Sequence, residues 1–540
     1  MHETNADVDV DVVVLGGGLA GLCLALQLRT RFADLSIRVL ERSAHPPRAG
    51  AHKVGESSVE INAHYLSHTL GLRAHLDEHQ VRKFGFRFFF SDARSDIGNV
   101  AELGVSEVLP TPTWQIDRGV FEAFLAEEAR RRGIEFSDKA TVLGVDLAER
   151  GMDHVVRFRH QGSEHTLRAR WLADASGRAG LLRRKLDLDV PTGHAANAVW
   201  LRIDARIKVD DWCSDADWQA RCTPQGERWR STNHLVGSGY WVWLIPLASG
   251  AHSIGIVADA ALHPLESMNT FDKALDWLAI HQPLLARECA AHRDQLLDFR
   301  FLRNYSHGCK QMFSGDRWAL TGDAGVFLDP FYSPGGDFIA IANTYICELV
   351  ARDRAGQPVG PYARIYNDLY LSFCASTLTL YKGQYPVFAS PTVLPLKVIW
   401  DYTYYWGVLC QIVFQQRLAD IALLGELRPE FERAQALNLR MQSLFRAWTE
   451  WASSRNERTL LDQSLLPWFT ELNRGLHDAL DDAQVRARLR DNVELLERLA
   501  ATIAENAVTD ADDALNDVFI DLVVAGPRVI LFAAAVAEAV

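Results

Sequence analysis

The sequence predicts an α/β fold that begins with a strand–helix–strand unit, continues into a strand-rich middle and ends in a helical region. Residues 9–15, Asp-Val-Asp-Val-Val-Val-Leu, predict a buried β-branched strand directly before three consecutive glycines, and an apolar helical pattern then leads to a second strand-like run at 36–41. Residues 190–305 show strand-like alternation with short helices mixed in. From about Ala340 onward strand-like patterns nearly vanish, so the remaining residues are predicted to be helical.

The elements between these landmarks follow from their patterns in turn. Residues 119–132 predict a helix, and residues 167–174 predict a strand. In the strand-rich middle, alternation places three apolar side chains on one face: Trp241, Trp243 and Ile245. Near the C-terminus, helical spacing connects Val485, Leu489, Val493, Leu496 and Leu499. We therefore expect a core at 1–340, whose Rossmann-like parts are about 1–60, 110–185 and 310–340 with a substrate-side sheet between them, and a helical region at 341–540.

Composition narrows the class of protein. The 540 residues are 48% hydrophobic with mixed charges, which is enough for two to three domain-sized units. A net charge of -13 argues against a nucleic-acid partner, because phosphates would be repelled. The eight cysteines form no CxxC pair and have no metal-ligand spacing, which favours a reducing cytoplasm and predicts no metal site.

The two ends of the sequence add weaker expectations. The segment Met1–Asp11 is acidic and lacks the basic region of a signal peptide. The segment Val518–Val540 is apolar, but its longest uncharged run, Val529–Ala537, is too short to span a bilayer. We expect no transmembrane span, and we expect this tail to pack in the core or against a second copy in a homodimer.

The first motif with a chemical meaning is Gly16-x-Gly18-x-x-Gly21, followed by Glu41 twenty residues later. The glycines permit a tight turn, close approach of a pyrophosphate, and tight helix–strand packing. The helix N-terminus attracts the diphosphate, and the acid after the second strand bonds ribose hydroxyls. Strand, turn, helix and acid are in register, so the motif predicts a dinucleotide site.

Two later segments resemble motifs of the flavoprotein monooxygenases. The segment 171–178, Trp-Leu-Ala-Asp-Ala-Ser-Gly-Arg, resembles the strand end that packs near their dinucleotide. The segment 320–324, Leu-Thr-Gly-Asp-Ala, resembles their GD motif, in which Asp323 would bond the ribityl chain of the flavin. The resemblance implies a Rossmann-like FAD-binding fold of this type, and FAD as the cofactor.

Further motifs narrow the resemblance to the flavin-dependent halogenases, and within them to those that act on phenols or pyrroles. Residues 241–246 read Trp-Val-Trp-Leu-Ile-Pro, which is similar to the WxWxIP signature of that family. Residues 327–335 match its FxxPxxSxG tunnel motif, and residues 82–85 resemble the stretch that carries its catalytic lysine. Lys83 is the candidate, with a simple surface lysine as the alternative reading and Lys53 as the competitor.

This resemblance implies a two-component enzyme. A separate flavin reductase supplies FADH2, which forms a C4a-hydroperoxide with oxygen, and chloride or bromide attacks it to give hypohalous acid. That acid reaches Lys83, which activates it for attack by a small aromatic substrate, either free or tethered to a carrier protein. The implied catalytic residues are Lys83 and Ser333. The implied cofactor-binding residues are Gly16, Gly18, Gly21, Glu41, Glu56, Ser57, Arg118, Asp323, Gly335 and Gly336.

Two departures from the family pattern bear on substrate and halide. Tryptophan halogenases have a glutamate directly before the tunnel serine, where this chain has Tyr332, so a phenol or pyrrole is expected rather than free tryptophan. The next residue after Ser333 is Pro334, which has no N–H to offer a halide. Gly335 and Gly336 could still form a small anion-binding nest. Trp241 and Trp243 are expected beside the flavin, where they would keep substrate away from the peroxide.

Three questions stay open at this point. An aromatic run in the C-terminal region could line a substrate cavity or simply form core: Tyr381, Tyr385, Phe388, Trp400, Tyr402, Tyr404, Tyr405 and Trp406. The same fold could serve a monooxygenase or other oxidoreductase that does not use halide. It could also belong to a flavin-binding accessory protein without turnover.

Overall fold

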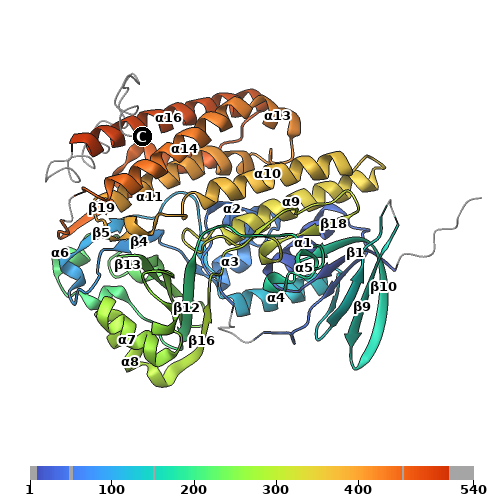
Figure 1. Ribbon diagram of the computed structural model, residues 1–540, viewed down its shortest axis with the longest axis horizontal. Coiled ribbons are helices and arrows are strands. Elements are labelled where there is room, and N and C mark those ends of the chain that lie inside the picture. Colours follow the sequence, from blue (N-terminus) through green and yellow to red (C-terminus); the bar gives the residue numbers. More distant parts are fainter. Residues whose placement is uncertain (1–8, 48–52, 150–151, 453–454, 510–540) are drawn as a thin grey trace, which may run out of the picture. The chain divides into compact units, whose positions relative to one another are not determined.

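The computed structural model describes residues 9–47, 53–149, 152–452 and 455–509 (Figure 1). The predicted α/β class, with an inserted strand-rich region and a helical C-terminal region, is confirmed. The chain folds into two compact units and passes between them repeatedly. Unit 1 contains residues up to His79, Ile116–Thr192 and Ser306–Ala375, and unit 2 contains Gln80–Gln115, Gly193–Tyr305 and the residues from Ser376 onward. The apolar tail Val518–Val540 lies outside the described residues.

Unit 1 is organised around a sheet that, within the described residues, has seven strands. Its order is β7-β2-β1-β10-β9-β8, and β18 pairs with β10. The strands are β1 (Val10–Leu15), β2 (Ile37–Leu40), β7 (Glu135–Ser137), β8 (Thr141–Asp146), β9 (His154–His160), β10 (Ser163–Asp174) and β18 (Trp318–Leu320). The predicted strands at 9–15, 36–41 and 167–174 are confirmed. Because Leu15, Asp174 and Leu320 pair in parallel register, three adjacent strands end at the same level.

The helices of unit 1 are α1 (Leu19–Arg31), α2 (Glu60–His64), α3 (Arg73–His79), α4 (Arg118–Arg131), α5 (Leu181–Lys185) and α9 (Gly335–Arg354). Among them, α1 and α5 have a glycine at the N-cap and α4 has an aspartate. The helix α4 begins one residue earlier than predicted. The reason is Asp117, whose carboxylate accepts the N–H groups of Gly119 and Val120 and so caps the helix.

Unit 2 contains a sheet that has eight strands in the described part of the chain, in the order β16-β12-β15-β14-β13-β4-β5-β19. The strands are β4 (Phe86–Phe89), β5 (Ala101–Gly104), β12 (Ala196–Ile203), β13 (Thr232–Gly237), β14 (Tyr240–Pro246), β15 (His252–Asp259), β16 (Leu296–Leu302) and β19 (Thr459–Asp462). The short strand β19 is a departure from the all-helical expectation after residue 340. It adds to the sheet edge by pairing in parallel with β5.

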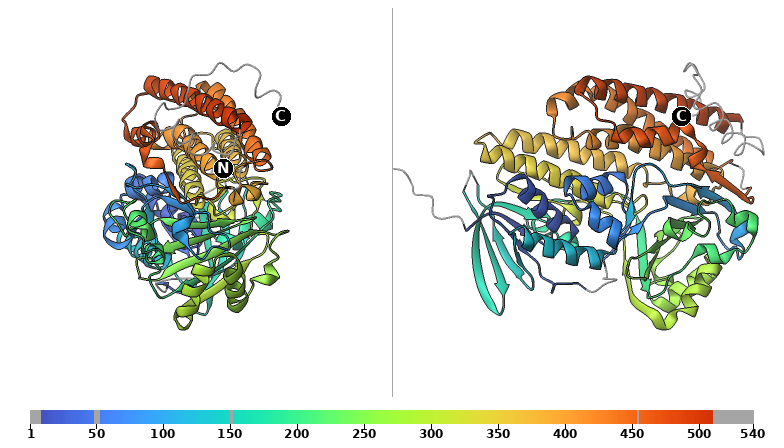
Figure 2. Two further views of the ribbon diagram at one scale, coloured as in Figure 1. Left: turned by 90° about the vertical axis from the view of Figure 1, so that its left-hand side faces the viewer. Right: turned by 180° about the vertical axis from the view of Figure 1, so that it is seen from behind.

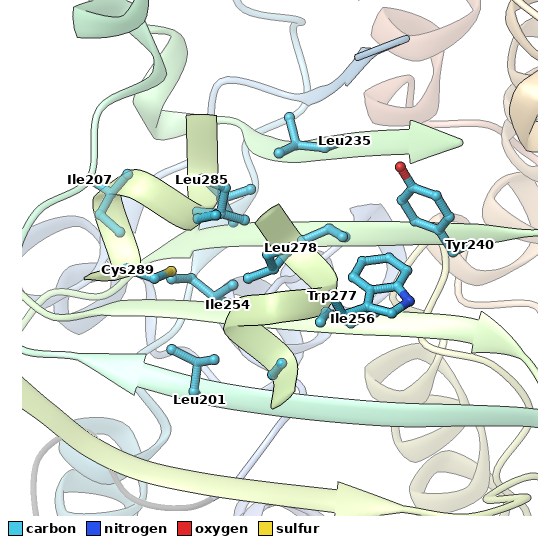
Figure 3. Packing of buried hydrophobic residues seen from close by; sticks show 14 of the residues in the cluster. Leu201, Ile207, Leu235, Tyr240, Ile254, Ile256, Trp277, Leu278, Leu285 and Cys289 are labelled. Atoms are coloured by element: carbon cyan, nitrogen blue, oxygen red, sulfur yellow. The ribbon is translucent and has the colours of Figure 1, made fainter. Parts of the chain in front are cut away.

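The two faces of this sheet have different roles. One face carries Tyr240, Val242 and Leu244 of β14 and packs against α7 (Phe271–His281) and α8 (Pro283–Ala291) as a buried hydrophobic core (Figure 3). Since strand side chains alternate, Trp241, Trp243 and Ile245 point to the opposite face, as predicted. That second face belongs to the candidate site described below.

The C-terminal part of unit 2 is helical. Its longer helices are α11 (Val393–Tyr404), α14 (Arg428–Trp448) and α16 (Asp482–Thr509), and α10 (Gly360–Leu378) connects the two units along the chain. The orange and red helices α14 and α16 run side by side in Figure 2. All five predicted positions on α16, from Val485 to Leu499, are fully buried. In the described part of the chain no helix could cross a membrane, no metal-binding cluster occurs, and all eight cysteines are free.

One buried histidine makes the stability of unit 2 depend on pH. His252 begins β15, and its Nδ1 accepts the N–H of Ile207 at 3.3 Å, which requires a neutral ring nitrogen. Burial, with a smaller contribution from Arg206, lowers the pKa of His252 to about 3. The unfolded chain takes up this proton near pH 6.5 and the folded chain does not, so stability is lost as pH falls from about 6.5 towards 3.

We therefore expect His252 to reduce the free energy of unfolding by about 2 kcal/mol between pH 7 and pH 5. Urea unfolding at both pH values measures this loss, and His252→Gln should show a smaller loss than the wild type. An unchanged pH dependence in the variant would contradict the assignment. His234, with its own lowered pKa, leaves a residual dependence in both proteins.

Candidate active site

Protein atoms enclose two of the three glycines of the motif and leave the third open. Gly16 has φ +114°, and a Cβ added there would lie 2.3 Å from the carbonyl oxygen of Ala175. A Cβ on Gly21 would lie 2.0 Å from the carbonyl oxygen of Gly16. A Cβ on Gly18 would meet only Glu122 and Lys53, each at 3.9 Å. The loop is thus packed against protein at Gly16 and Gly21, and leaves room beside Gly18.

Glu41 lies against this loop, as the motif predicts. One carboxylate oxygen accepts the N–H of Gly17 at 2.7 Å, and the other accepts the N–H of Ser43 at 2.7 Å. The carboxylate therefore holds the turn that joins β1 to α1 while lying at the end of β2. This placement brings the acid and the glycines of the motif together.

A buried charged cluster stands at the start of α1. Glu122 accepts the N–H of Leu19 at 3.2 Å and a guanidinium N–H of Arg118 at 2.5 Å, and it also pairs with Lys53. Burial alone would raise the pKa of Glu122, but Arg118 and Lys53 hold it below its usual value. The sequence analysis missed Glu122, although its place one helical turn after Arg118 was a usable signal.

The three dinucleotide motifs meet at the carboxyl ends of β1, β10 and β18. The Asp174 carbonyl accepts the N–H of Thr321 at 3.0 Å, and its carboxylate accepts the N–H groups of Ser176 and Leu182. Gly322 has φ +62° and approaches the Cβ of Ala20 so closely that its own added Cβ would lie 3.0 Å away. This edge is where parallel α/β sheets bind their ligands.

Asp323 lies in this convergence with two basic neighbours. Burial raises the pKa of its carboxyl group, and Arg178 and His307 act in the opposite direction. The His307 ring donates to the Asp323 carbonyl oxygen at 3.0 Å, and its backbone exchanges hydrogen bonds with Phe327. The GD segment is therefore linked directly to the first residue of the FxxPxxSxG segment.

Glu56 and Ser57 are buried in unit 1, near Arg118. The Glu56 carbonyl accepts the N–H of Ile116 at 2.5 Å, and Arg118 donates to the Val54 carbonyl at 2.6 Å. The structure thus brings Glu56, Ser57 and Arg118 into one neighbourhood, next to the loop of Gly18 through Lys53 and Glu122.

The segment before α9 is strained. Tyr332 and Ser333 both have positive φ, +65° and +58°, which costs on the order of 1–3 kcal/mol for each non-glycine residue. Pro334 caps α9, and a Cβ on Gly336 would lie 2.3 Å from the Asn62 side chain, so this turn packs tightly on α2. Gly335 has open space around it. Strain of this kind is typical of ligand-binding segments.

Lys83 lies in unit 2 and is buried, with 4% of its surface exposed. Its ammonium nitrogen stands 3.5 Å from the ring centre of Phe86, and its backbone N–H donates to the Thr113 carbonyl at 2.9 Å. This burial rules out the reading of Lys83 as a surface lysine. The Lys53 side chain, in contrast, is 38% exposed and bound to Glu122 in unit 1.

The surroundings of Lys83 are aromatic. His234 meets Phe86 edge-on at 5.3 Å, stacks on Phe88 at 4.5 Å, and lies 5.5 Å from Trp241 between ring centres. Burial chiefly, and the nearby Lys83 charge, lower the pKa of His234 to about 3. Its Nδ1 lies 3.3 Å from the Arg87 carbonyl. Since a carbonyl only accepts, Nδ1 carries the proton and Nε2 is the acceptor nitrogen of a neutral ring.

The C-terminal aromatic run divides between this site and the core. Tyr402 lies 6.0 Å from Phe86, and Trp406 lies 4.7 Å from Tyr402, so both extend the aromatic group around Lys83. Trp400 is fully buried and donates its indole N–H to Asn438 of α14 at 3.0 Å. The run therefore contributes both to the aromatic group around Lys83 and to the helical core of unit 2.

The fold and the glycine loop define a dinucleotide-binding α/β protein, and comparison with known families specifies the dinucleotide. The family model described as "FAD binding domain" matches residues 9–324, which is more than half of the chain. The chain belongs to this FAD-binding domain family. The match runs through all three motifs that converge in unit 1.

Several known proteins similar to the chain are halogenases by name. A flavin-dependent halogenase of Dictyostelium discoideum is 27% identical over 379 residues, which cover 64% of this chain and 61% of that protein. A 1H-pyrrole-2-carbonyl-(peptidyl-carrier protein) brominase of Pseudoalteromonas luteoviolacea is 26% identical over 61% of this chain and 74% of its own length. The chain thus spans about three-fifths of the length of the first relative.

The solved structure of a halogenase called PltM shares the fold. It is 16% identical, its TM-score is 0.63, and the alignment covers 91% of this chain and 97% of that one.

The residues of unit 1 fit FAD. The space beside Gly18, the positive end of the α1 dipole and the cations Arg118 and Lys53 suit a diphosphate. Glu41 at the end of β2 suits a ribose, and half-buried Asp323 suits the hydroxyls of the ribityl chain. These residues would hold the cofactor. A side chain at Gly16 or Gly21 would collide with backbone carbonyl oxygens, so both positions require glycine.

Proposed function

We propose that the chain is an FADH2- and O2-dependent halogenase of an electron-rich aromatic compound, with Lys83 as the residue that activates the halogen electrophile. The observation that carries the proposal is the buried ammonium of Lys83 among Phe86, His234 and Trp241. An ammonium group can donate a hydrogen bond to an oxidised halogen species, and an aromatic compartment suits an aromatic substrate. The names of the similar proteins support the same activity.

Bound FADH2, with O2, supplies the oxidising equivalents that convert chloride or bromide to hypohalous acid. The Lys83 ammonium then donates a hydrogen bond to the oxygen of that acid, which makes the halogen more electrophilic. The aromatic carbon attacks the halogen, so a carbon–halogen bond forms, the halogen–oxygen bond breaks, and the oxygen leaves as water after taking a proton. The ring carbon then loses its proton and aromaticity returns.

Halide binding is proposed at the start of α9. Pro334 offers no N–H, so the amides of Gly335 and Gly336 in the first turn of the helix are the remaining donors. The strained Tyr332 and Ser333 would fix the entry of the chain into this turn, and Ser333 would act on the halide or the acid formed from it.

The proposed substrate is a phenol or a pyrrole. Tyr332 replaces the glutamate expected for tryptophan substrates, so the substrate has to supply its own electron density. The pyrrole brominase among the similar proteins acts, by its name, on a substrate attached to a peptidyl carrier protein. A carrier-tethered substrate is therefore proposed beside a free one. A separate flavin reductase, a cytoplasmic location and a homodimer also stay proposals.

A second candidate function is aromatic hydroxylation without halide, and Pro334 is the observation that favours it. The two candidates separate in one experiment, in which protein, flavin reductase, NADPH and bromide are incubated with phenols, pyrroles and indoles. Mass spectrometry should show a brominated phenol or pyrrole. Hydroxylated products with no bromine would favour the second candidate, and no oxygen consumption with reduced flavin would favour an accessory protein.

NADPH alone is expected not to reduce the bound FAD at a useful rate. The single dinucleotide motif in the sequence at Gly16–Gly21 is assigned to FAD, which leaves the reducing equivalents to a partner protein. Stopped-flow measurement of flavin absorbance, with and without an added reductase, checks this expectation. Rapid bleaching by NADPH without the partner would indicate a one-component hydroxylase.

A further inference from the structure

The backbone around Lys83 is held from two sides within unit 2. On one side the Lys83 N–H donates to Thr113. On the other side the segment 228–232 makes four hydrogen bonds with residues 82–85. Phe84 N–H donates to the Arg230 carbonyl at 3.2 Å, Thr232 N–H to Gly85 at 3.1 Å, the Arg230 side chain to Arg82 at 3.0 Å, and the Ser231 hydroxyl to Phe84 at 2.9 Å. The position of Lys83 thus depends on the segment 228–232.

Arg87, four residues after Lys83, connects β4 to a buried ionic cluster. Its guanidinium is fully buried, pairs with Glu102, and donates to the Val105 carbonyl at 2.5 Å. Its carbonyl accepts the His234 ring N–H at 3.3 Å. A single residue therefore fixes β4, which follows Lys83, and the orientation of His234.

Arg228 connects the other segment to the same carboxylate. It is fully buried, and its Nε donates to Glu102 at 2.9 Å. Its guanidinium also lies 3.7 Å from the ring centre of Trp218, and its backbone N–H donates to Asp210 at 3.1 Å. Both arginines thus share the carboxylate of Glu102. Arg87 lies in β4, directly after the Lys83 segment, and Arg228 begins the segment 228–232 that holds Lys83 in place.

The electrostatics make Glu102 decisive. Two buried guanidinium groups converge on one buried carboxylate, and Asp210 approaches Arg228 only at 3.9 Å. Without the charge of Glu102, two like charges would repel each other in a medium of low dielectric constant. Arg87 and Arg228 would then separate, and each would move its own segment.

We propose that Glu102 is a positioning residue for the chemistry at Lys83: through Arg87 and Arg228 it holds the Lys83 segment and His234 in their working arrangement. The proposal rests on the proposed function of Lys83. Misplacing a catalytic group by an ångström is enough to lower its rate severely. Glu102 would hold this arrangement without contacting the substrate. Its replacement should therefore lower halogen transfer and leave oxygen consumption unchanged.

The test compares Glu102→Gln with Asp298→Asn. Asp298 and Arg202 form a buried ion pair in the same sheet, but it joins β16 to β12, which β15, β14 and β13 separate from β4. Both variants should unfold at lower urea concentration than the wild type. Only Glu102→Gln should lower the yield of halogenated product per oxygen consumed, by about tenfold or more. Glu102→Asp, which retains the charge, should recover part of that yield.

A second readout does not depend on halogenation. Hydrogen exchange measured by mass spectrometry should quicken at the amides of Lys83, Phe84 and Thr232 in Glu102→Gln, and stay at the wild-type rate in Asp298→Asn. Equal yields and equal local exchange in the two variants would overturn the proposal. If Glu102→Gln does not fold, Glu102→Asp decides by the same measurements. If the wild type makes no halogenated product, the proposed function fails, and local exchange alone decides whether Glu102 positions the Lys83 segment.

Discussion

Replacing Lys83 with alanine is expected to abolish halogenation while FAD binding and oxygen consumption stay near their wild-type values. Lys83 lies in unit 2 among aromatic side chains, whereas the glycine loop, Arg118 and Asp323 belong to unit 1. Loss of the ammonium removes the donor that activates the electrophile and leaves the cofactor residues untouched. Loss of one such donor or acid typically costs a factor of about 10²–10⁴ in rate. Product formation and oxygen uptake, measured in the same reaction, check both halves of the prediction.

Two further variants serve as controls for Lys83→Ala. Lys83→Met retains the aliphatic chain that packs beside Phe86, so it separates the missing charge from a cavity. Lys53→Ala removes the competing lysine, which pairs with Glu122 beside Gly18, and should weaken FAD binding instead. Wild-type halogenation by Lys83→Ala would reject the assignment and make Lys53 the next candidate. Lost oxygen consumption would instead place Lys83 in the cofactor site.

Replacing Gly18 with alanine is expected to lower FAD affinity by at least about tenfold, or about 1.4 kcal/mol, with little effect on the stability of the free protein. Gly18 has φ -86°, which alanine adopts without strain, and its added methyl would meet no protein atom closer than 3.9 Å. The methyl group would therefore occupy only space that the diphosphate needs. Titration of the free protein with FAD, followed by flavin fluorescence, measures the affinity.

The matched control for Gly18→Ala is Gly21→Ala. A Cβ at Gly21 would lie 2.0 Å from the Gly16 carbonyl oxygen, so this variant should destabilise the free protein before any cofactor is added. In this motif Gly18 thus leaves space for the ligand, whereas Gly21 permits close packing of the protein backbone. Unchanged FAD affinity in a folded Gly18→Ala protein would contradict the placement of the diphosphate beside Gly18.

The sequence predicted the local features of the fold well. The glycine motif, the strands at 9–15 and 36–41, and the alternation that places Trp241 and Trp243 on one face all depend on residues close together in the chain. Their physical causes are period, turn geometry and propensity, which short segments express. The FAD-binding assignment followed from three motifs whose order along the chain was itself informative, and the family match confirms it.

What the sequence did not predict depends on distant partners. The burial of Lys83 results from β4 pairing with β13, nearly 150 residues away, and nothing near residue 83 indicates it. The importance of Glu102 comes from cations elsewhere in the chain, Arg87 and Arg228. Glu122 pairs with distant Lys53 as well as with Arg118, which lies one helical turn before it. The strand β19 is only four residues long and is stabilised by its neighbour β5, so its own pattern was too short to detect.

The proposed activity is the oxidation of halide and the transfer of the halogen to an aromatic carbon. The most direct test is the product that one electron-rich phenol or pyrrole yields when a flavin reductase supplies FADH2 in air with bromide present. We expect a product whose mass spectrum shows the paired bromine isotope peaks, formed by the wild type and lost with Lys83→Ala. A product that carries oxygen in place of bromine, formed equally with and without bromide, would contradict it.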